Sequence, residues 1–166
     1  MKKTGLLGAM TAATFAVAGC SIFHTQAVAK DCDTNADCAV TVVVTPRDGT
    51  PACTIADPGD IHVPSGKKPE IVWRIQNDGG GQFKFARQTG AVALKSGTWA
   101  PVFDDKGAGG SGGPEYRVKD KNNQKKARPS DPPFRFPYKI TVVKPDDTPG
   151  CFLDPVIVNE GCDPNC

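Results

Sequence analysis

Short runs of β-forming residues, separated by turn residues, recur along this chain from residue 39 onward. The clearest runs are rich in Val, Ile, Thr, Phe and Tyr, and they lie at 39–45, 70–76, 82–86, 115–118 and 138–143. Proline, glycine, aspartate and asparagine fill the gaps, as they do in turns. Ile71, Trp73 and Ile75 alternate with other residues, which places them on one face of a strand. The pattern predicts an all-β fold, an antiparallel β-sandwich of about seven to nine short strands.

Helical structure is disfavoured after the N-terminal leader. No window there shows an apolar stripe at helical spacing, and the chain of 166 residues contains 15 prolines and 18 glycines. Roughly 120 residues of short strands can bury a workable core, so one domain suffices. Within it, Val72 interrupts a polar row, which suggests that this outer face is partly covered. Pro155 predicts an edge strand or a bulge in the last run.

An uncharged apolar run follows two lysines at the N-terminus. Residues 5–19 carry no charge, and this layout is that of a secretory signal, too short to span a membrane. The sequence VAGC at 17–20 resembles a bacterial lipobox, so we expect Cys20 to carry lipid and to become the mature N-terminus. By the same resemblance, Ser21 suggests sorting to the outer membrane. The alternative cut, after AVA at 27–29, would release a soluble periplasmic or secreted domain.

These signals divide the chain into three parts. Residues 1–19 are predicted to be the signal peptide, 20–31 a polar tether, and 32–166 the β-sandwich domain. The tether is suited to holding a domain away from a membrane surface.

Six cysteines remain once Cys20 is set aside. They are Cys32, Cys38, Cys53, Cys151, Cys162 and Cys166. An even number in an exported chain predicts three disulfides. Close spacing favours Cys32 with Cys38 and Cys162 with Cys166, which leaves Cys53 with Cys151 as a long-range link. A cross-link between the two terminal pairs stays open.

The charge of the mature chain is balanced. Lys2 and Lys3 account for the formal +2, and without them 18 basic residues face 18 acidic ones. This balance excludes the basic field that nucleic-acid binders use. One local exception is a run with a single acid and six basic residues: Arg117, Lys119, Lys121, Lys125, Lys126 and Arg128. We interpret this run as a solvated hairpin tip. It is also a candidate contact for anionic lipid headgroups or lipopolysaccharide.

Metal and nucleophile chemistry is disfavoured by spacing, and no cofactor is expected. Zinc or type 1 copper would need clustered His and Cys, yet His24 and His62 are far apart and there is no C-x-x-C. The GGSGG sequence at 109–113 matches a nucleophile elbow only formally, because an elbow needs a buried strand before it and a helix after it, whereas the charged FDDK precedes and PEY follows. Residues 33–37 begin like a calcium loop and then depart from the pattern, so we interpret them as turn formers. Calcium shared between the two Cys-containing ends stays open.

Several segments resemble the DP-EP family of small bacterial domains. They are IVWRI at 71–75, FKF at 83–85, YRVKDKN at 116–122, YKITVV at 138–143 and LDPVIVN at 153–159. The resemblance covers roughly residues 39–160 and implies a cupredoxin-like or immunoglobulin-like β-sandwich with no assigned activity. The terminal cysteine pairs and the glycine-rich insert depart from the family pattern.

Together these features predict a cell-envelope lipoprotein whose β-sandwich is a non-catalytic binding or structural module. The N-terminal lipid would hold it on the membrane, and its loops or an open edge would contact an envelope protein or an anionic envelope component. The candidate binding surface consists of Lys84, Arg87 and the 117–128 run. The alternative is a secreted or periplasmic hydrolase that uses carboxylates, with candidate acids Asp57, Asp60, Asp104 and Asp154.

Overall fold

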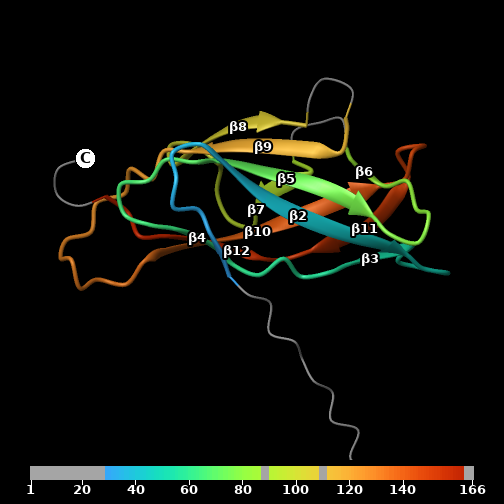
Figure 1. The fold of residues 1–166 in the computed structure, drawn as a ribbon, viewed down its shortest axis with the longest axis horizontal. Helices are drawn as coiled ribbons and strands as arrows, with labels where there is room; N and C mark the ends of the chain where they lie inside the picture. The colour runs from blue at the N-terminus through green and yellow to red at the C-terminus, as the bar shows by residue number, and fades with distance from the viewer. Residues whose placement is uncertain (1–28, 87–89, 109–111, 163–166) are drawn as a thin grey trace, which may run out of the picture.

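A computed structural model of the chain describes residues 29–86, 90–108 and 112–162. Within these residues the secondary structure consists of twelve strands and no helix, arranged as two sheets packed face to face (Figure 1). No helix in the described ranges could span a membrane. The predicted all-β sandwich is therefore confirmed. The strands outnumber the prediction because several have only two or three residues, too few to show alternation in the sequence.

The first sheet has five strands. Their order is β3 (Cys53–Ile55), β2 (Asp37–Pro46), β5 (Glu70–Asn77), β9 (Glu115–Asp120) and β8 (Phe103–Gly107). The second sheet follows the path β1 (Lys30–Asp31), β4 (Ile61–Val63), β12 (Val156–Asn159), β10 (Phe134–Val143) and β11 (Pro149–Leu153). Two short strands also pair with β10: β6 (Lys84–Phe85) and β7 (Val92–Leu94).

The sheets are mixed rather than purely antiparallel. β2 pairs with β5 in parallel, and β4 pairs in parallel with both β1 and β12. The chain leaves the first sheet after β3, forms β4 in the second sheet, and returns as β5. Because this crossover replaces a hairpin, β2 and β5 run in the same direction. Local sequence patterns do not reveal which sheet a short strand joins.

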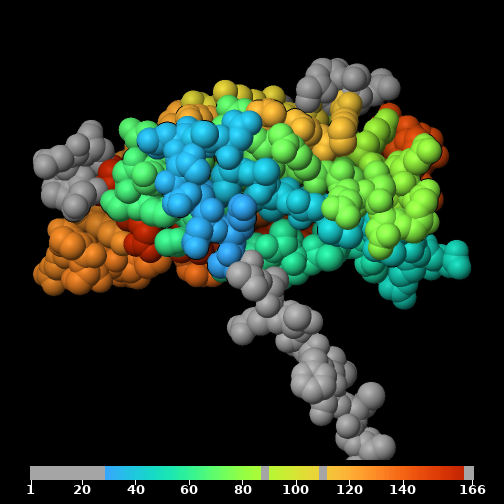
Figure 2. Space-filling view, viewed as in Figure 1, coloured from blue at the N-terminus to red at the C-terminus, as the bar shows by residue number. Residues whose placement is uncertain are grey.

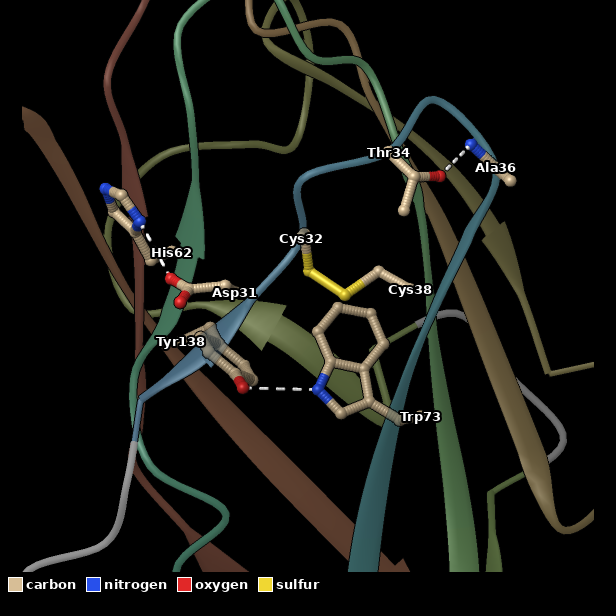
Figure 3. Close-up of a disulfide and its surroundings, with 8 residues drawn as sticks. All are labelled: Asp31, Cys32, Thr34, Ala36, Cys38, His62, Trp73 and Tyr138. Carbon is tan, nitrogen blue, oxygen red and sulfur yellow. Dashed lines mark hydrogen bonds and ion pairs between the residues drawn. A yellow bond between two sulfur atoms is a disulfide. The ribbon is translucent and has the colours of Figure 1, made fainter.

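Alternating residues of the long strands build the core. Val40, Val42 and Val44 of β2 point inward, and Ile71 and Trp73 of β5 are fully buried as predicted. Other fully buried side chains in the interior are Tyr116, Val118, Tyr138, Ile140 and Val142. The Trp73 indole Nε1 donates a hydrogen bond to the Tyr138 hydroxyl across the sandwich, at 3.2 Å (Figure 3). Each buried polar tip therefore has a partner, which removes the penalty of an unpaired buried group.

Two predicted disulfides are present. Cys32–Cys38 closes the chain just before β2 (Figure 3), and Cys53–Cys151 joins β3 of one sheet to β11 of the other. The third predicted pair includes Cys166, which lies outside the described residues. The long link spans a sequence separation of 98 residues, so it restricts the unfolded chain far more than the short one does.

Pro155 divides the last predicted run into two strands. β11 ends at Leu153 and β12 begins at Val156. The sequence predicted one edge or bulged strand; of the two strands observed, β11 lies at the edge of the sheet and β12 lies between β4 and β10. Both strands pair with β10, and the Pro155 carbonyl accepts a hydrogen bond from the Tyr138 backbone N–H at 3.0 Å. The carboxylate of Asp154, which lies in this turn, pairs with Lys95 at 3.0 Å.

Candidate functional site

The basic run at 117–128 does not form a hairpin tip. Arg117 and Lys119 lie in β9, which pairs with β5 on one side and β8 on the other. Residues 121–133 then connect β9 to β10 in the other sheet. The hairpin prediction is wrong because β9 already has a neighbour on each side, so the chain leaves the sheet instead of turning back.

Arg117 is the centre of an ion-pair network on the outer face of the five-stranded sheet. Its guanidinium contacts Glu70 at 2.8 Å, Glu115 at 3.0 Å and Asp37 at 3.3 Å. The hydrogen bond from Arg117 lowers the pKa of Glu70. Val72, the cross-strand neighbour of Arg117, is fully buried although it faces outward. The long basic side chain thus covers an apolar residue, as the interruption at Val72 suggested.

Most other cations of the run also have partners. Lys121 Nζ lies 2.6 Å from Asp104, and Lys126 Nζ lies 2.7 Å from Glu160. Lys119 Nζ donates to a backbone carbonyl. The cations of this run that have no ion pair to a described residue are Lys119, Lys125 and Arg128, and Lys119 is held by its backbone carbonyl partner. Pairing of this kind leaves little uncompensated positive charge for a ligand.

His62 lies in strand β4 and is half-buried between two carboxylates. Its Nδ1 is 3.1 Å from Asp31 and its Nε2 is 3.1 Å from Glu160; Figure 3 draws the first contact. Burial lowers the pKa of His62, and the hydrogen bonds to Glu160 and Asp31 outweigh that effect, so the net pKa is raised. A protonated His62 therefore links β1, β4 and the end of β12.

Three polar side chains are fully buried at the end of the sandwich where β9 and β12 stop. Asp120 ends β9, Asn122 follows it, and Asn159 ends β12. The Asp120 Oδ1 accepts hydrogen bonds from the Asn122 backbone N–H at 2.7 Å and from Asn159 Nδ2 at 3.2 Å. The two segments at 116–122 and 153–159 that carry the DP-EP resemblance thus meet at their last residues. We did not expect this cluster from the sequence.

Burial raises the pKa of Asp120 to about 7, although hydrogen bonds from Asn122 and Asn159 act in the opposite direction. The Asp120 Oδ2 and the Oδ1 atoms of both asparagines have no hydrogen-bond partner among the described residues. A carboxylate without full compensation is costly in such surroundings. Because the cluster is closed to solvent, it is a titrating structural element and not an open binding site.

The four carboxylates named for hydrolysis have separate structural partners. Asp57 and Asp60 precede β4, Asp104 lies in β8, and Asp154 lies between β11 and β12. Their contacts are Asp57 with the Gly59 backbone N–H, Asp60 with Arg135, Asp104 with Lys121, and Asp154 with Lys95.

Several predicted features fall outside the described residues, namely Cys20, His24, Arg87, residues 109–111 and Cys166. In the loop at 33–37, Thr34 Oγ1 accepts the Ala36 backbone N–H at 2.7 Å, and Asn35 Oδ1 accepts the Lys68 backbone N–H at 2.8 Å. Both side-chain oxygens therefore accept hydrogen bonds from backbone N–H groups, as turn-forming residues do. Within 29–86, 90–108 and 112–162, no cluster of three or more His, Cys, Asp or Glu could hold a metal ion.

A groove lies at the end of the molecule opposite the buried polar cluster. Three loops form it: the β2–β3 turn at 46–52, the β5–β6 loop at 78–83, and the start of the β10–β11 turn at 144–145 (Figures 1 and 2). Its volume is about 500 Å³. The residues that line it include Pro46, Arg47, Asp48, Phe83 and Lys144. Loops carried on a braced sandwich are a common place for binding.

The groove is braced by side chains and by a disulfide. Asn77 holds Phe83 through both of its backbone groups, with distances of 2.8 Å to the N–H and 3.0 Å to the carbonyl. A Cβ at Gly81 would lie 2.9 Å from the Phe83 ring, so only glycine fits there. At Gly150 a Cβ would lie 3.2 Å from Cys53 Sγ and 3.3 Å from Phe83. The Cys53–Cys151 link and the Phe83 ring therefore both pack against Gly150.

The charges at the groove differ from those of the basic run. Arg47 and Lys144 line it, and neither side chain has an ion pair or hydrogen bond to a described residue. Asp48 is the one acid among the lining residues. Lys84, which we expected at the binding surface, lies beside the groove and is engaged by Asp147 at 2.9 Å. Arg47 and Lys144 were not among the predicted binding residues, although each lies next to a proline in a turn sequence.

Comparison with models of known protein families finds no match for this chain, and a search of curated proteins finds no similar one. The resemblance to the DP-EP family therefore stays a prediction.

Proposed function

We propose that this protein is a cell-envelope lipoprotein whose β-sandwich is a non-catalytic binding module, and that the groove binds an anionic group of an envelope component. The observation that carries the proposal is the pair of cations, Arg47 and Lys144, lining a groove braced by the Cys53–Cys151 disulfide. Three of the six cations at 117–128 are instead ion-paired within the domain.

The envelope location is supported by two independent features. The apolar leader ends in VAGC at 17–20, which supplies a lipid acceptor at Cys20. The disulfides Cys32–Cys38 and Cys53–Cys151 are stable in an oxidising compartment such as the periplasm or the cell surface. A lipid on Cys20, followed by a polar tether, would hold the sandwich near the membrane surface.

The groove supports an anionic ligand through charge and shape. A guanidinium and an ammonium that lack internal partners are available for charge-assisted hydrogen bonds to a phosphate or carboxylate. Phe83 and Pro46 supply apolar surface between the loops. Because the mature chain has balanced charge, attraction to an anion would be local and not a property of the whole molecule.

A binding experiment tests the groove with a matched control. The exported chain carrying Cys20→Ser, which lacks the lipid acceptor, is mixed with inorganic phosphate or with phosphatidylglycerol–phosphatidylethanolamine vesicles. The double variant Arg47→Glu, Lys144→Glu should lower binding to at least one probe by about tenfold or more. The control Lys125→Glu, Arg128→Glu makes the same charge change at 117–128 and should have little effect.

The two probes separate a free anion from a lipid headgroup. Equal binding by wild type and the Arg47→Glu, Lys144→Glu variant would overturn the groove proposal. If only the control variant Lys125→Glu, Arg128→Glu lost binding, the ligand would contact the 117–128 run and not the groove.

The anchor is tested separately by the intact mass of protein extracted from membranes. We expect a diacylglyceryl-modified N-terminal cysteine at residue 20 and a shift of the Cys20→Ser variant to the soluble fraction. A mature protein that begins at Lys30 would rule out the lipid anchor and leave the groove proposal standing.

A further inference from the structure

One edge of the five-stranded sheet is open along most of its length. On one side, the first eight residues of β2 pair with β5, from Asp37 with Glu70 to Val44 with Asn77. On the other side, β3 pairs only with Val44, Thr45 and Pro46. The next residue after β3, Ala56, adds a hydrogen bond to the Val43 carbonyl at 3.0 Å. Among the described residues, no strand pairs with residues 37–42 on that outer side.

The direction of the backbone groups follows from the hydrogen bonds. The Ala36 and Val44 carbonyls both accept from the β5 side, from Glu70 at 3.2 Å and Asp78 at 2.9 Å. Because successive residues of a strand face opposite sides, the even-numbered residues of β2 direct their N–H and C=O groups to β5. The odd-numbered residues, Asp37, Ala39 and Thr41, therefore direct theirs to the open edge.

This edge carries little of the usual protection against strand pairing, because Asp37 is the one charged residue at 37–42. Residues 38–45 are CAVTVVVT, with no charge and no proline, and the side chains of Ala39 and Thr41 are exposed. Natural edge strands of this length normally carry lysine, proline or a bulge.

The opposite edge of the same sheet has these protections. β8 contains Asp104, Asp105 and Lys106, and its register with β9 shifts between Asp105 and Gly107. The contrast between the two edges shows that the lack of charge at β2 is a local property and not a general feature of the sheet.

We propose that the open edge of β2 at 37–42 pairs antiparallel with the same edge of a second copy of this chain, forming one continuous sheet across both copies. Outward N–H and C=O groups on one edge are complementary to those of an identical edge related by a two-fold axis. A register centred on Ala39 places Thr41 opposite Asp37, so no like charges meet.

The balanced charge of the chain and the short length of the shared edge indicate a weak dimer. The mature chains carry balanced charge, so two copies do not repel each other at long range. Asp37 is already compensated by Arg117 within its own chain, at 3.3 Å. The shared edge is only a few residues long, so the dimer should be weak and should form between roughly 10 µM and 1 mM. The Cys32–Cys38 disulfide, which is drawn in Figure 3, fixes the start of the strand and limits the entropy lost on pairing.

Sedimentation of the exported Cys20→Ser chain between 10 µM and 1 mM tests the proposal. Wild type should shift from monomer toward dimer, and Ala39→Lys should reduce the dimer fraction at 1 mM at least fivefold, because residue 39 faces its own copy and the change brings two lysines together at the two-fold axis. The matched control is Thr45→Lys, an exposed position on the same strand where β3 already occupies the edge. It should leave association unchanged.

Amide hydrogen exchange gives a second readout that does not depend on a variant. The Ala39 and Thr41 amides should exchange rapidly at 10 µM and more slowly at 1 mM. A monomer at all concentrations, or equal loss of dimer in Thr45→Lys and Ala39→Lys, would overturn the proposal. Protection of both amides that is complete at 10 µM would also overturn it, since the edge would then be covered within one chain. Urea denaturation of each variant confirms that it is folded.

Discussion

The two ends of the sandwich use their charged groups in different ways. At the end formed by the 64–69 and 121–133 loops, Lys126 is ion-paired and Asp120 is fully buried (Figure 1). At the groove end, Arg47 and Lys144 have no side-chain partner among the described residues. The densest basic run in the sequence therefore lies largely at the end where charge stabilises the fold. Two isolated cations in turns supply the uncompensated charge at the other end.

The two ends are also held together by different interactions. A covalent link, Cys53–Cys151, lies beneath the groove, whereas hydrogen bonds among Asp120, Asn122 and Asn159 hold the opposite end. A covalent link keeps its effect across pH, while a buried carboxylate makes stability depend on pH. The predictions below test this difference.

The largest expected effect is loss of the long disulfide. Replacing Cys53 and Cys151 by alanine should lower the free energy of unfolding by about 2–5 kcal/mol. The matched control replaces Cys32 and Cys38 by alanine and opens a loop with a sequence separation of 6 instead of 98. The control should lose about 2 kcal/mol less. Urea denaturation under oxidising conditions measures both. Equal losses would show that loop entropy does not explain the stabilisation.

The second prediction concerns Asp120. Its pKa is raised to about 7 in the folded chain, so the folded state keeps a proton that the unfolded state releases near pH 4. Stability therefore falls as pH rises from about 4 to 7, by about 3–4 kcal/mol, and is level above that range. Asp120→Asn, which cannot ionise, should remove this fall. Urea denaturation of both proteins from pH 4 to pH 8 measures the difference, and parallel curves would contradict the prediction.

A smaller pH effect with the same sign is expected at His62. Because its pKa is raised by Glu160 and Asp31, its contribution is complete below about pH 6.5 and is lost as pH rises through the folded-state pKa. His62→Gln should thus destabilise the protein at pH 5.5 and have less effect at pH 8.5. Thermal unfolding of the variant at these two pH values measures the change. An equal loss at both would show that the ring contributes through packing alone.

The smallest effects compare one cation from each end. Lys126 is mostly buried and paired with Glu160 at 2.7 Å, so Lys126→Met should lower the free energy of unfolding by about 1 kcal/mol. Lys144→Met should change it by less than about 0.5 kcal/mol, because Lys144 has no ion pair or hydrogen bond to lose, only an attraction to the exposed carboxylate of Asp146. Chemical denaturation measures both variants. If Lys144→Met lowered the free energy of unfolding more than Lys126→Met, then Lys144 and not Lys126 would be the cation that stabilises the fold.

Much of the fold could be predicted from local sequence. Alternation at Ile71 and Trp73 correctly placed both in the core, and close spacing correctly paired Cys32 with Cys38. These predictions succeed because neighbouring residues on a strand have a fixed geometric relation. The hairpin prediction at 117–128 failed because partner strands, not local charge, determine where a chain turns.

The candidate site was largely beyond reach of the sequence. Arg47 and Lys144 are far apart along the chain and share one groove only because the β2–β3 and β10–β11 turns lie at the same end of the sandwich. The buried cluster likewise joins Asp120 to Asn159 across the two sheets. No local pattern specifies such contacts, since they depend on strand order and register.

By itself, the sequence determined the all-β class, the inward faces of the long strands and the short disulfide, because each follows from residues close together along the chain. Only the tertiary structure decided that β2 and β5 run parallel, that one edge of β2 stays open, and which cations are ion-paired. These features depend on which strands become neighbours, and that choice is made by packing the whole core at once.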